Sequence, residues 1–86
     1  MISKSVLITY PSGLHARPLS KFIGLVKKYK SDITLLTPKG EVKCNSIVNL
    51  LAAAIKQGTT VEVRADGVDQ AEALAEIVHF LENMHE

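Results

Sequence analysis

The hydrophobic and polar residues of this chain alternate with two different periods. Between residues 60 and 65, the apolar side chains of Val61, Val63 and Ala65 alternate with polar ones, which is typical of a strand with one buried face. Between residues 19 and 29, apolar residues instead recur at intervals of three and four, the period of an amphipathic helix. The chain therefore combines half-buried strands with amphipathic helices.

Turn and capping residues divide the rest of the chain. Pro18 is tolerated only in the first turn of a helix, so the first helix must begin at about His15 or Ala16. The pattern predicts strands near 2–9, 33–35, 42–44 and 60–65, a hairpin turn at 37–40, and helices after residues 15, 46 and 69. The order β-α-β-β-α-β-α predicts one α+β domain over 1–86, a four-stranded antiparallel sheet with three helices on one face.

Two helix starts carry specific expectations. Ser46 is expected to cap the second helix, which should stop at Gly58. Asp69 and Glu72 have the spacing of a capping box for the last helix. The expected apolar stripe of the second helix consists of Ile47, Leu50, Leu51, Ala54 and Ile55, and that of the last helix of Leu74, Ile77, Val78 and Leu81.

The net charge of +1 conceals a segregation of charge along the chain. Residues 1–31 contain six basic side chains and no acid, whereas residues 66–86 contain six acids and neither lysine nor arginine. This asymmetry favours oriented encounters with an acidic partner protein, although solvated helix faces of different sign remain an equal alternative. Nucleic acid is a weak candidate because the basic set is sparse and no tryptophan is present for stacking.

Other broad classes are excluded by composition. Cys44 is the single cysteine, so no intramolecular disulfide can form, which favours a reducing compartment. The N-terminus does not resemble a signal peptide, and the most apolar stretch, 47–55, is far shorter than the roughly 20 residues that span a bilayer. We therefore expect a cytoplasmic domain without membrane insertion.

The stretch Gly-Leu-His-Ala-Arg-Pro at 13–18 carries the candidate chemistry. His15 would lie at a helix N-terminus, where free backbone N–H groups and the helix dipole bind anions and favour a neutral, nucleophilic imidazole. Arg17 adds a planar fork suited to phosphoryl oxygens, Gly13 lets the turn approach closely, and Ser12 offers a hydroxyl. From spacing alone, His15 as an ordinary turn or capping histidine remains the favoured reading.

The sequence offers no second catalytic group near His15. It contains no serine-histidine-acid set, no metal-ligand spacing and no glycine-rich phosphate loop. His79 and His85 are six residues apart, which does not place them on one helical face for a metal. A histidine with one arginine can accept and pass on a phosphoryl group, which favours a carrier without cofactor or metal over an enzyme.

The motif at 13–18, the basic amphipathic helix after it and the serine at 46 together resemble the HPr family over essentially the whole chain. These proteins are the histidine-containing phosphocarriers of the bacterial phosphoenolpyruvate-dependent sugar phosphotransferase system. The resemblance implies an open-faced β-sandwich with strand order 1-4-2-3. It also implies that His15 accepts phosphate on Nδ1 from Enzyme I and passes it to IIA domains of sugar permeases, while Arg17 stabilises the phosphoryl group.

The resemblance extends to further residues and partners. Ser12, Gly13 and Ala16 would support the phosphate site, and a monomer would expose one face to successive partners. The implied partner surface consists of Ser20, Lys21, Lys27, Ile47, Val48 and Leu51. Of the apolar members, Ile47 and Leu51 also belong to the expected core stripe of the second helix. Val48 is therefore the clearest exposed contact.

Ser46 matches the regulatory serine of the family, which an HPr kinase/phosphorylase modifies in Gram-positive relatives. Asn45 and Asn49 depart from the residues frequent in the family, and Ala52–Ala54 replaces a stretch that often contains serine, leucine and glycine. These departures leave the His15 chemistry intact but bear on recognition of Ser46. The alternative is therefore an HPr-like regulatory module that acts through Ser46 phosphorylation and binds a catabolite-control transcription regulator.

Overall fold

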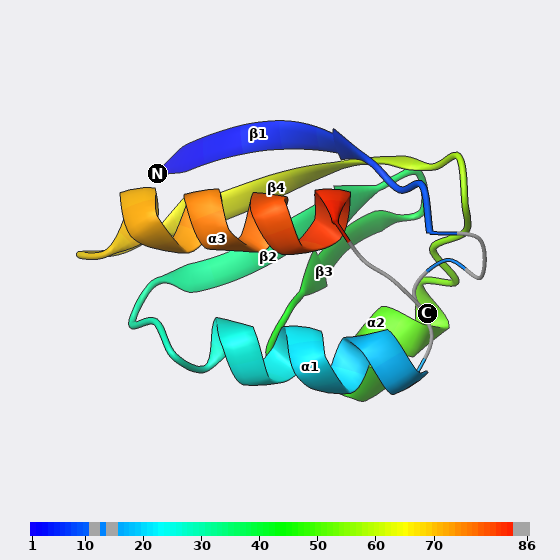
Figure 1. Ribbon diagram of the computed structural model, residues 1–86, viewed down its shortest axis with the longest axis horizontal. Helices are drawn as coiled ribbons and strands as arrows, with labels where there is room; N and C mark the ends of the chain where they lie inside the picture. The colour runs from blue at the N-terminus through cyan, green and yellow to red at the C-terminus, as the bar shows by residue number, and fades with distance from the viewer. Residues whose placement is uncertain (11–12, 14–15, 84–86) are drawn as a thin grey trace.

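A computed structural model describes residues 1–10, 13 and 16–83, with the backbone alone at 16 and 17. Its elements follow the expected order (Figure 1). They are β1 (Ile2–Leu7), α1 (Ala16–Val26), β2 (Asp32–Thr37), β3 (Gly40–Lys43), α2 (Ile47–Ala52), β4 (Thr60–Asp66) and α3 (Gln70–Glu82).

The four strands form one antiparallel sheet in the order β1-β4-β2-β3. β4 lies between β1 and β2, with Val63 opposite Lys4 on one side and Leu35 on the other. β2 and β3 are joined by the expected tight turn, in which Thr37 pairs with Gly40. The strand order and the antiparallel pairing confirm the predicted fold class.

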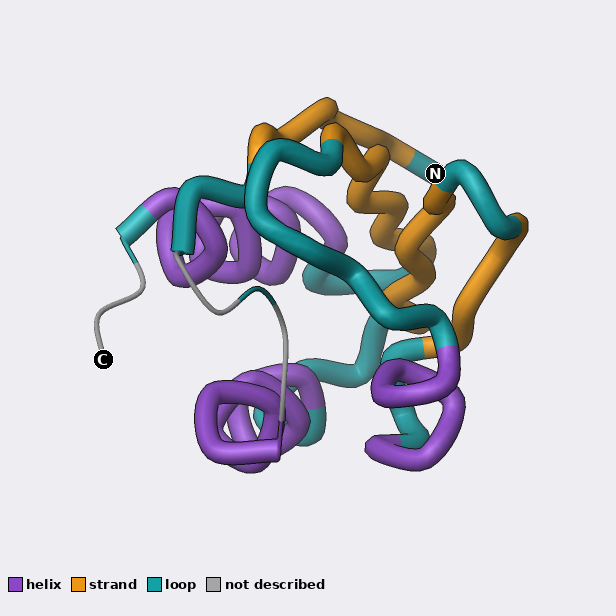
Figure 2. Tube along the Cα trace, turned by 90° about the vertical axis from the view of Figure 1, so that its right-hand side faces the viewer, coloured by secondary structure: helices purple, strands orange, loops and turns teal. Residues whose placement is uncertain are grey.

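The helices cover one face of the sheet, as Figures 1 and 2 show from two directions. The side chains that β4 directs toward them, Val61, Val63 and Ala65, are fully buried, whereas Glu62 and Arg64 on the other face are half-exposed and form an ion pair of 2.7 Å. This is the burial pattern that the alternation in the sequence predicts. The sheet is therefore open on one side.

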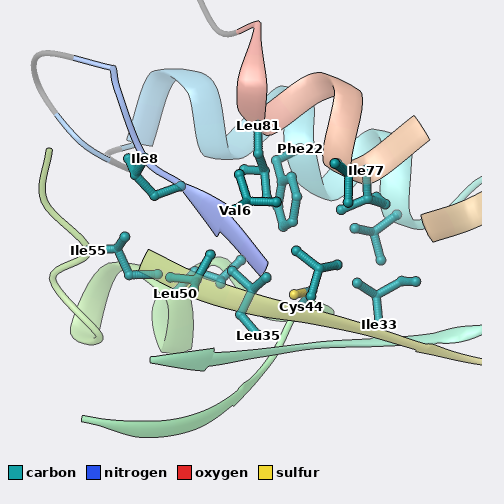
Figure 3. Packing of buried hydrophobic residues seen from close by; sticks show 14 of the residues in the cluster. Val6, Ile8, Phe22, Ile33, Leu35, Cys44, Leu50, Ile55, Ile77 and Leu81 are labelled. Carbon is teal, nitrogen blue, oxygen red and sulfur yellow. The ribbon is translucent and has the colours of Figure 1, made fainter. Parts of the chain in front are cut away.

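The core lies between the sheet and the helices. Figure 3 shows Phe22 from α1 and Ile77 and Leu81 from α3 packed against residues from the strands. The fully or nearly fully buried apolar residues include Val6, Ile8, Leu19, Phe22, Leu35, Cys44, Leu50, Val61, Val63, Ile77 and Leu81. The expected stripes of α1 and α3 are thus largely confirmed, with Leu74 only partly buried and Ala73 buried in its place.

The second helix is shorter than expected. α2 ends at Ala52 rather than continuing toward Gly58, and Ala53 is its C-cap. Ala54 has a positive φ of 50°, the left-handed conformation that ends many helices. Ile55 is buried but lies beyond the helix, and Ala54 is exposed rather than part of an apolar stripe.

The capping box predicted for α3 is wrong. Asp69 occupies the N-cap position, but its side chain makes no capping hydrogen bond. One carboxylate oxygen instead accepts from the Lys30 N–H at 2.9 Å, and the other accepts from the N–H and the hydroxyl of Ser31. Asp69 therefore fastens the loop between α1 and β2 to the start of α3.

Three further boundaries differ slightly from expectation. β1 ends at Leu7, although the backbone of Ile8 still pairs with residues 58 and 59. α1 ends at Val26, so Tyr29 packs against the core from the following turn. Cys44 is buried on the core side but follows the last residue of β3.

Candidate functional site

The first helix begins at the residue that the proline spacing predicts. α1 starts at Ala16, and Pro18 is its third residue and is buried. Proline is tolerated there because the N–H groups of the first turn have no intrahelical acceptor. The first turn contains no acidic side chain, so no carboxylate of α1 itself competes for an anion at this end.

Gly13 anchors the segment that leads into α1. It is buried, has a φ of +66°, and its N–H donates to the Tyr10 carbonyl at 2.9 Å. A Cβ at this position would lie 2.4 Å from the Ile55 carbonyl oxygen and 2.8 Å from the Lys56 Cα. Glycine is therefore required both by the backbone conformation and by the close approach of another backbone segment.

The segment that meets Gly13 connects α2 to β4 and is itself tied to the end of β1. The Ile8 N–H donates to the Thr59 carbonyl at 2.9 Å, and the Gly58 N–H donates to the Ile8 carbonyl at 2.7 Å. The side-chain amide of Gln57 donates to the Thr9 carbonyl at 3.2 Å. These bonds extend the β1–β4 pairing beyond the sheet and hold the end of β1 and the 55–59 segment together, next to the place where Gly13 packs.

Two of the predicted site residues, Ser12 and His15, lie outside the described residues, as do the side chains of Ala16 and Arg17. Their predicted roles therefore stay predictions. The structure does describe two features on either side of His15 in the sequence, namely the packed Gly13 and the N-terminus of α1. The amino-acid sequence alone indicated both of these features, but it gave no sign of the 55–57 backbone that packs on Gly13.

The N-terminus of α2 has the predicted cap. The Ser46 hydroxyl accepts from the Asn49 N–H at 3.3 Å, with Ser46 in an extended conformation. Ser46 is half-buried, so its hydroxyl serves as a local cap near the surface. The expected cap at Ser46 is confirmed, and it is independent of any regulatory role of this serine.

α2 exposes two large apolar side chains. Val48 is 70% exposed and Leu51 is 41% exposed, and their spacing of three places them on one side of the helix. Ile47 is half-buried against the core, and Leu50 is fully buried. Leu51 was expected in the core stripe, but it lies at the surface with Val48, and Leu50 is the residue of α2 that fills the core.

The predicted polar members of the partner surface lie on α1 and just after it. Ser20, Lys21 and Lys27 are all exposed, and Lys27 follows the last residue of α1 directly, with its N–H still bonded to the Ile23 carbonyl. α1 packs against α2. These polar residues and the apolar pair Val48–Leu51 therefore lie on or next to neighbouring helices.

The other reactive side chains of the described residues lie apart from this region or are inert. Burial raises the pKa of the Cys44 thiol to about 12, so the thiolate that would react is scarce at neutral pH. His79 is exposed on α3, where its ring lies near the Asn83 side chain. Among residues 1–10, 13 and 16–83, no cluster of three metal-binding side chains occurs, and no helix is long and apolar enough to cross a membrane.

Comparison with known proteins identifies the family. Residues 2–83 match the sequence profile described as the phosphotransferase-system HPr component phosphorylation site. The phosphocarrier protein HPr of Mycoplasma pneumoniae is 41% identical over 78 residues, which cover 90% of this chain and 89% of that protein. The chain therefore belongs to the HPr family, the phosphocarrier proteins of the phosphotransferase system.

Solved structures agree with this assignment and with the open-faced sandwich. The structure of a mycoplasma histidine-containing phosphocarrier protein superposes with a TM-score of 0.87 at 37% identity, covering 92% of this chain and 90% of that one. Crh of Bacillus subtilis, named for catabolite repression and described as a domain-swapped dimer, matches with a TM-score of 0.76 at 30% identity, covering 99% of this chain and 100% of that one. A histidine-containing phosphocarrier and a relative named for catabolite repression therefore share this fold.

Proposed function

We propose that this chain carries a phosphoryl group on His15, which it accepts from phosphorylated Enzyme I and passes to IIA domains of sugar permeases. The proposal is supported by one structural observation above the rest. α1 begins at Ala16, so the histidine of the family motif immediately precedes a helix N-terminus that no acidic side chain of its first turn occupies. Such a terminus stabilises the negative charge of a phosphoryl group.

The transfer requires a nucleophile and compensation of charge, and the proposal assigns both. The Nδ1 lone pair of neutral His15 attacks phosphorus, the P–N bond at His15 forms, and the bond to the donor breaks as the donor leaves. Arg17 and the first-turn N–H groups of α1 stabilise the charge on the phosphoryl oxygens. The same steps in reverse deliver the group to the acceptor, so neither water nor a cofactor is consumed.

The same proposal assigns the partner surface to α1 and α2. Val48 and Leu51 form an exposed apolar contact, and Ser20, Lys21 and Lys27 add polar and positively charged groups on and just after the neighbouring helix α1. Apolar residues at the centre with charges around them are the usual arrangement of a transient interface. A carrier in the cytoplasm would use this one surface for donor and acceptor in turn, as a monomer.

A regulatory function of Ser46 is the second candidate. It is supported by the half-buried hydroxyl at the start of α2 and by the likeness to Crh, whose name refers to catabolite repression. A phosphate added there by an HPr kinase/phosphorylase would place negative charge beside Val48, on the proposed partner surface. We expect it to slow transfer at His15 and to favour binding of a transcription regulator.

Incubation with phosphoenolpyruvate and Enzyme I tests the first candidate. We expect an acid-labile, base-stable phosphate that tandem mass spectrometry locates on His15 and that His15→Ala abolishes. His79→Ala is the matched control, since it removes another exposed histidine from a remote helix and should leave the adduct intact. A phosphate that persists in His15→Ala would overturn the assignment.

ATP and an HPr kinase/phosphorylase test the second candidate. We expect a base-labile phosphate that is lost in Ser46→Ala, and slower acceptance from Enzyme I once Ser46 is modified. If Ser46 stays unmodified, or if its modification leaves acceptance unchanged, the regulatory function is excluded for this chain.

A further inference from the structure

The segment that follows α2 brings Lys56 against Gly13. A Cβ at Gly13 would lie 2.8 Å from the Lys56 Cα, so the backbones of the two residues are in direct contact. The Lys56 carbonyl accepts from the Thr59 N–H at 3.1 Å, and the side-chain amide of Gln57 donates to the Thr9 carbonyl at 3.2 Å. Figure 1 shows this segment and the start of α1 at the same end of the molecule. Lys56 therefore has a defined place beside the chain that leads into α1.

The two segments that meet at Gly13 each contain one permanent charge, and both charges are positive. Lys56 is the only charged residue in the stretch 44–61. Arg17 is the only permanently charged residue in the stretch 5–20. No acidic residue of either stretch opposes them, so a negatively charged group at this junction meets cations from two separate parts of the chain.

The charge of Lys56 is not neutralised by a neighbour. Its side chain is exposed, and neither of the two ion pairs among the described residues includes it. On the side toward the β2–β3 turn it lines a cavity of about 220 Å³, in which Lys39 is the only other charged residue. No carboxylate of that cavity holds the flexible ammonium group away from Gly13, so its charge is available to a group bound nearby.

The length of the chain limits the distance between this charge and the proposed phosphoryl site. Consecutive Cα atoms are about 3.8 Å apart, so the Cα of His15 lies within about 8 Å of the Cα of Gly13. Exposed charges act on one another over roughly a Debye length, about 10 Å at 0.1 M ionic strength. A phosphoryl group carries a charge of about −2, so Lys56 is close enough to stabilise it through the electric field.

We propose that Lys56 supplies a second positive charge to the phosphoryl site, in addition to Arg17, and thereby stabilises the phosphorylated form of His15. This inference rests on the proposed carrier function and adds a residue that lies outside the motif at 13–18. The charge favours the more negative of the two forms of the chain, so it raises the fraction that carries phosphate at equilibrium. A lysine that only attracted an acidic partner would change the rates of transfer and leave this equilibrium unaltered.

Competition between two forms of the chain tests the inference. Isotopically labelled wild type and Lys56→Gln are mixed in equal amounts with catalytic Enzyme I and enough phosphoenolpyruvate to load half of the chains. Enzyme I passes phosphoryl groups between the two forms, and the P–N bond of one breaks as that of the other forms. Mass spectrometry at neutral pH follows the mixture to equilibrium. At about 0.1 M ionic strength, we expect the ratio of phosphorylated to free chain to be roughly two- to threefold higher for the wild type.

Further variants distinguish the charge from its location. Lys56→Arg keeps the charge and should restore the wild-type ratio, whereas Lys56→Glu should enlarge the difference to roughly four- to ninefold, because the change of charge is twice as large. A salt concentration of about 1 M should remove both differences. Lys4→Gln is the matched control, since it removes an exposed lysine from β1, which Figure 1 shows on the opposite side of the molecule from α1 and α2. Its ratio should equal that of the wild type.

The outcomes separate this inference from the carrier function on which it rests. The role of Lys56 alone is overturned if wild type and Lys56→Gln carry phosphate on His15 in equal proportion, whether or not their rates differ. It is also overturned if Lys4→Gln has the same effect as Lys56→Gln, since the net charge of the chain would then be the cause. If the wild type acquires no phosphate on His15, the carrier function fails, and this inference fails with it.

Discussion

Two glycines lie at opposite ends of the β1–β4 ladder, and each packs where a Cβ does not fit. The ladder runs from the pair Leu7–Thr60 to the pair Ile2–Ala65. Gly13 lies beyond the first end, where a Cβ would be 2.4 Å from the Ile55 carbonyl oxygen. Gly67 lies beyond the second end, where a Cβ would be 2.7 Å from the Ser31 Cα.

The neighbours of the two glycines differ in kind. Ser31, beside Gly67, is 5% exposed, and its N–H and hydroxyl both donate to the Asp69 carboxylate. The three atoms that would lie nearest to a Cβ at Gly13 are all backbone atoms of residues 55–57. One end is thus held by a charged side chain, and the other by the path of two backbone segments.

This difference predicts that the two glycines contribute differently to the stability of the fold and to phosphoryl transfer. A junction made of backbone atoms tolerates changes of side chain around it, which suits the end that leads into the proposed phosphoryl site. The junction with Asp69 depends on ionisation and lies at the end of the ladder away from the proposed phosphoryl site. We expect changes at Gly13 to affect transfer and stability together, and changes at Gly67 to affect stability alone.

Gly13→Ala should have the largest effect. The left-handed φ and the contact with the Ile55 carbonyl should together cost about 3 kcal/mol in the free energy of unfolding. Acceptance of phosphate from Enzyme I should also slow roughly tenfold or more, because the segment entering α1 must shift. Urea unfolding and rapid-quench transfer measure the two; a stability loss with normal transfer would show that Gly13 is only structural.

Gly67→Ala should cost somewhat less, about 2 kcal/mol, since it displaces Ser31 and strains the backbone at a φ of +158°. The rate of phosphate acceptance per folded molecule should equal that of the wild type. Measured in the same two assays, a slowed transfer in the folded variant would contradict the separation of the two ends.

Asp69 makes the second junction sensitive to pH. Hydrogen bonds from the Ser31 hydroxyl and the Lys30 N–H lower the pKa of Asp69 from its usual value. A lowered pKa adds stability above the unfolded value, near pH 4, and this stability is lost as pH falls through the folded value. Asp69→Asn should therefore be less stable than wild type at pH 7, and the difference should shrink below about pH 4.

Denaturant unfolding at several pH values measures this effect, and Ser31→Ala is the companion variant. Ser31→Ala removes the hydrogen bond from the Ser31 hydroxyl, the largest cause of the lowered pKa of Asp69. The stability of this variant should therefore depend less on pH than that of the wild type in the acid range. A constant difference between Asp69→Asn and wild type at every pH would contradict an electrostatic role.

Ala54→Gly should have the smallest effect and the opposite sign. An alanine at a φ of +50° costs about 1 kcal/mol or more, and part of the gain from glycine is lost to the entropy of the unfolded chain. The net gain should be about 0.5 kcal/mol, or a rise of roughly 2–4 °C in Tm. Calorimetry measures it, and a decrease in Tm would show that Ala54 makes contacts that outweigh the strain.

The sequence correctly predicted those features that are determined by residues close together in the chain. The alternation from Val61 to Ala65, the position of Pro18 and the cap at Ser46 each act within a few residues, and each is confirmed. The hairpin at 37–40 belongs to the same group. In all of these the decisive hydrogen bonds or packing faces are set by neighbours in the sequence.

The prediction for Asp69 was wrong because its side chain binds donors that are distant in the sequence, and the length of α2 was also predicted wrongly. Asp69 has the spacing of a capping box with Glu72, but its carboxylate binds the backbone of Lys30 and Ser31, 39 and 38 residues away. α2 was expected to continue toward Gly58, but a turn with Ala54 in the left-handed conformation ends it early, and Leu51 lies at the surface instead of in the core. The spacing of residues within one segment indicates which local hydrogen bonds are possible. It carries no information about hydrogen-bond donors that a distant segment supplies after folding.

The sequence by itself determined the periods of the elements, the start of α1 beside His15, the cap of α2 and, through the family motif, membership of the HPr family. Only the tertiary structure decided what meets Gly13, what Asp69 binds, and that Lys4 lies on an edge strand beside α3. The physical reason is the range of the interactions. Periodicity and capping act over a few residues, whereas close backbone approach, long-range hydrogen bonds and strand edges exist only once distant segments are packed together.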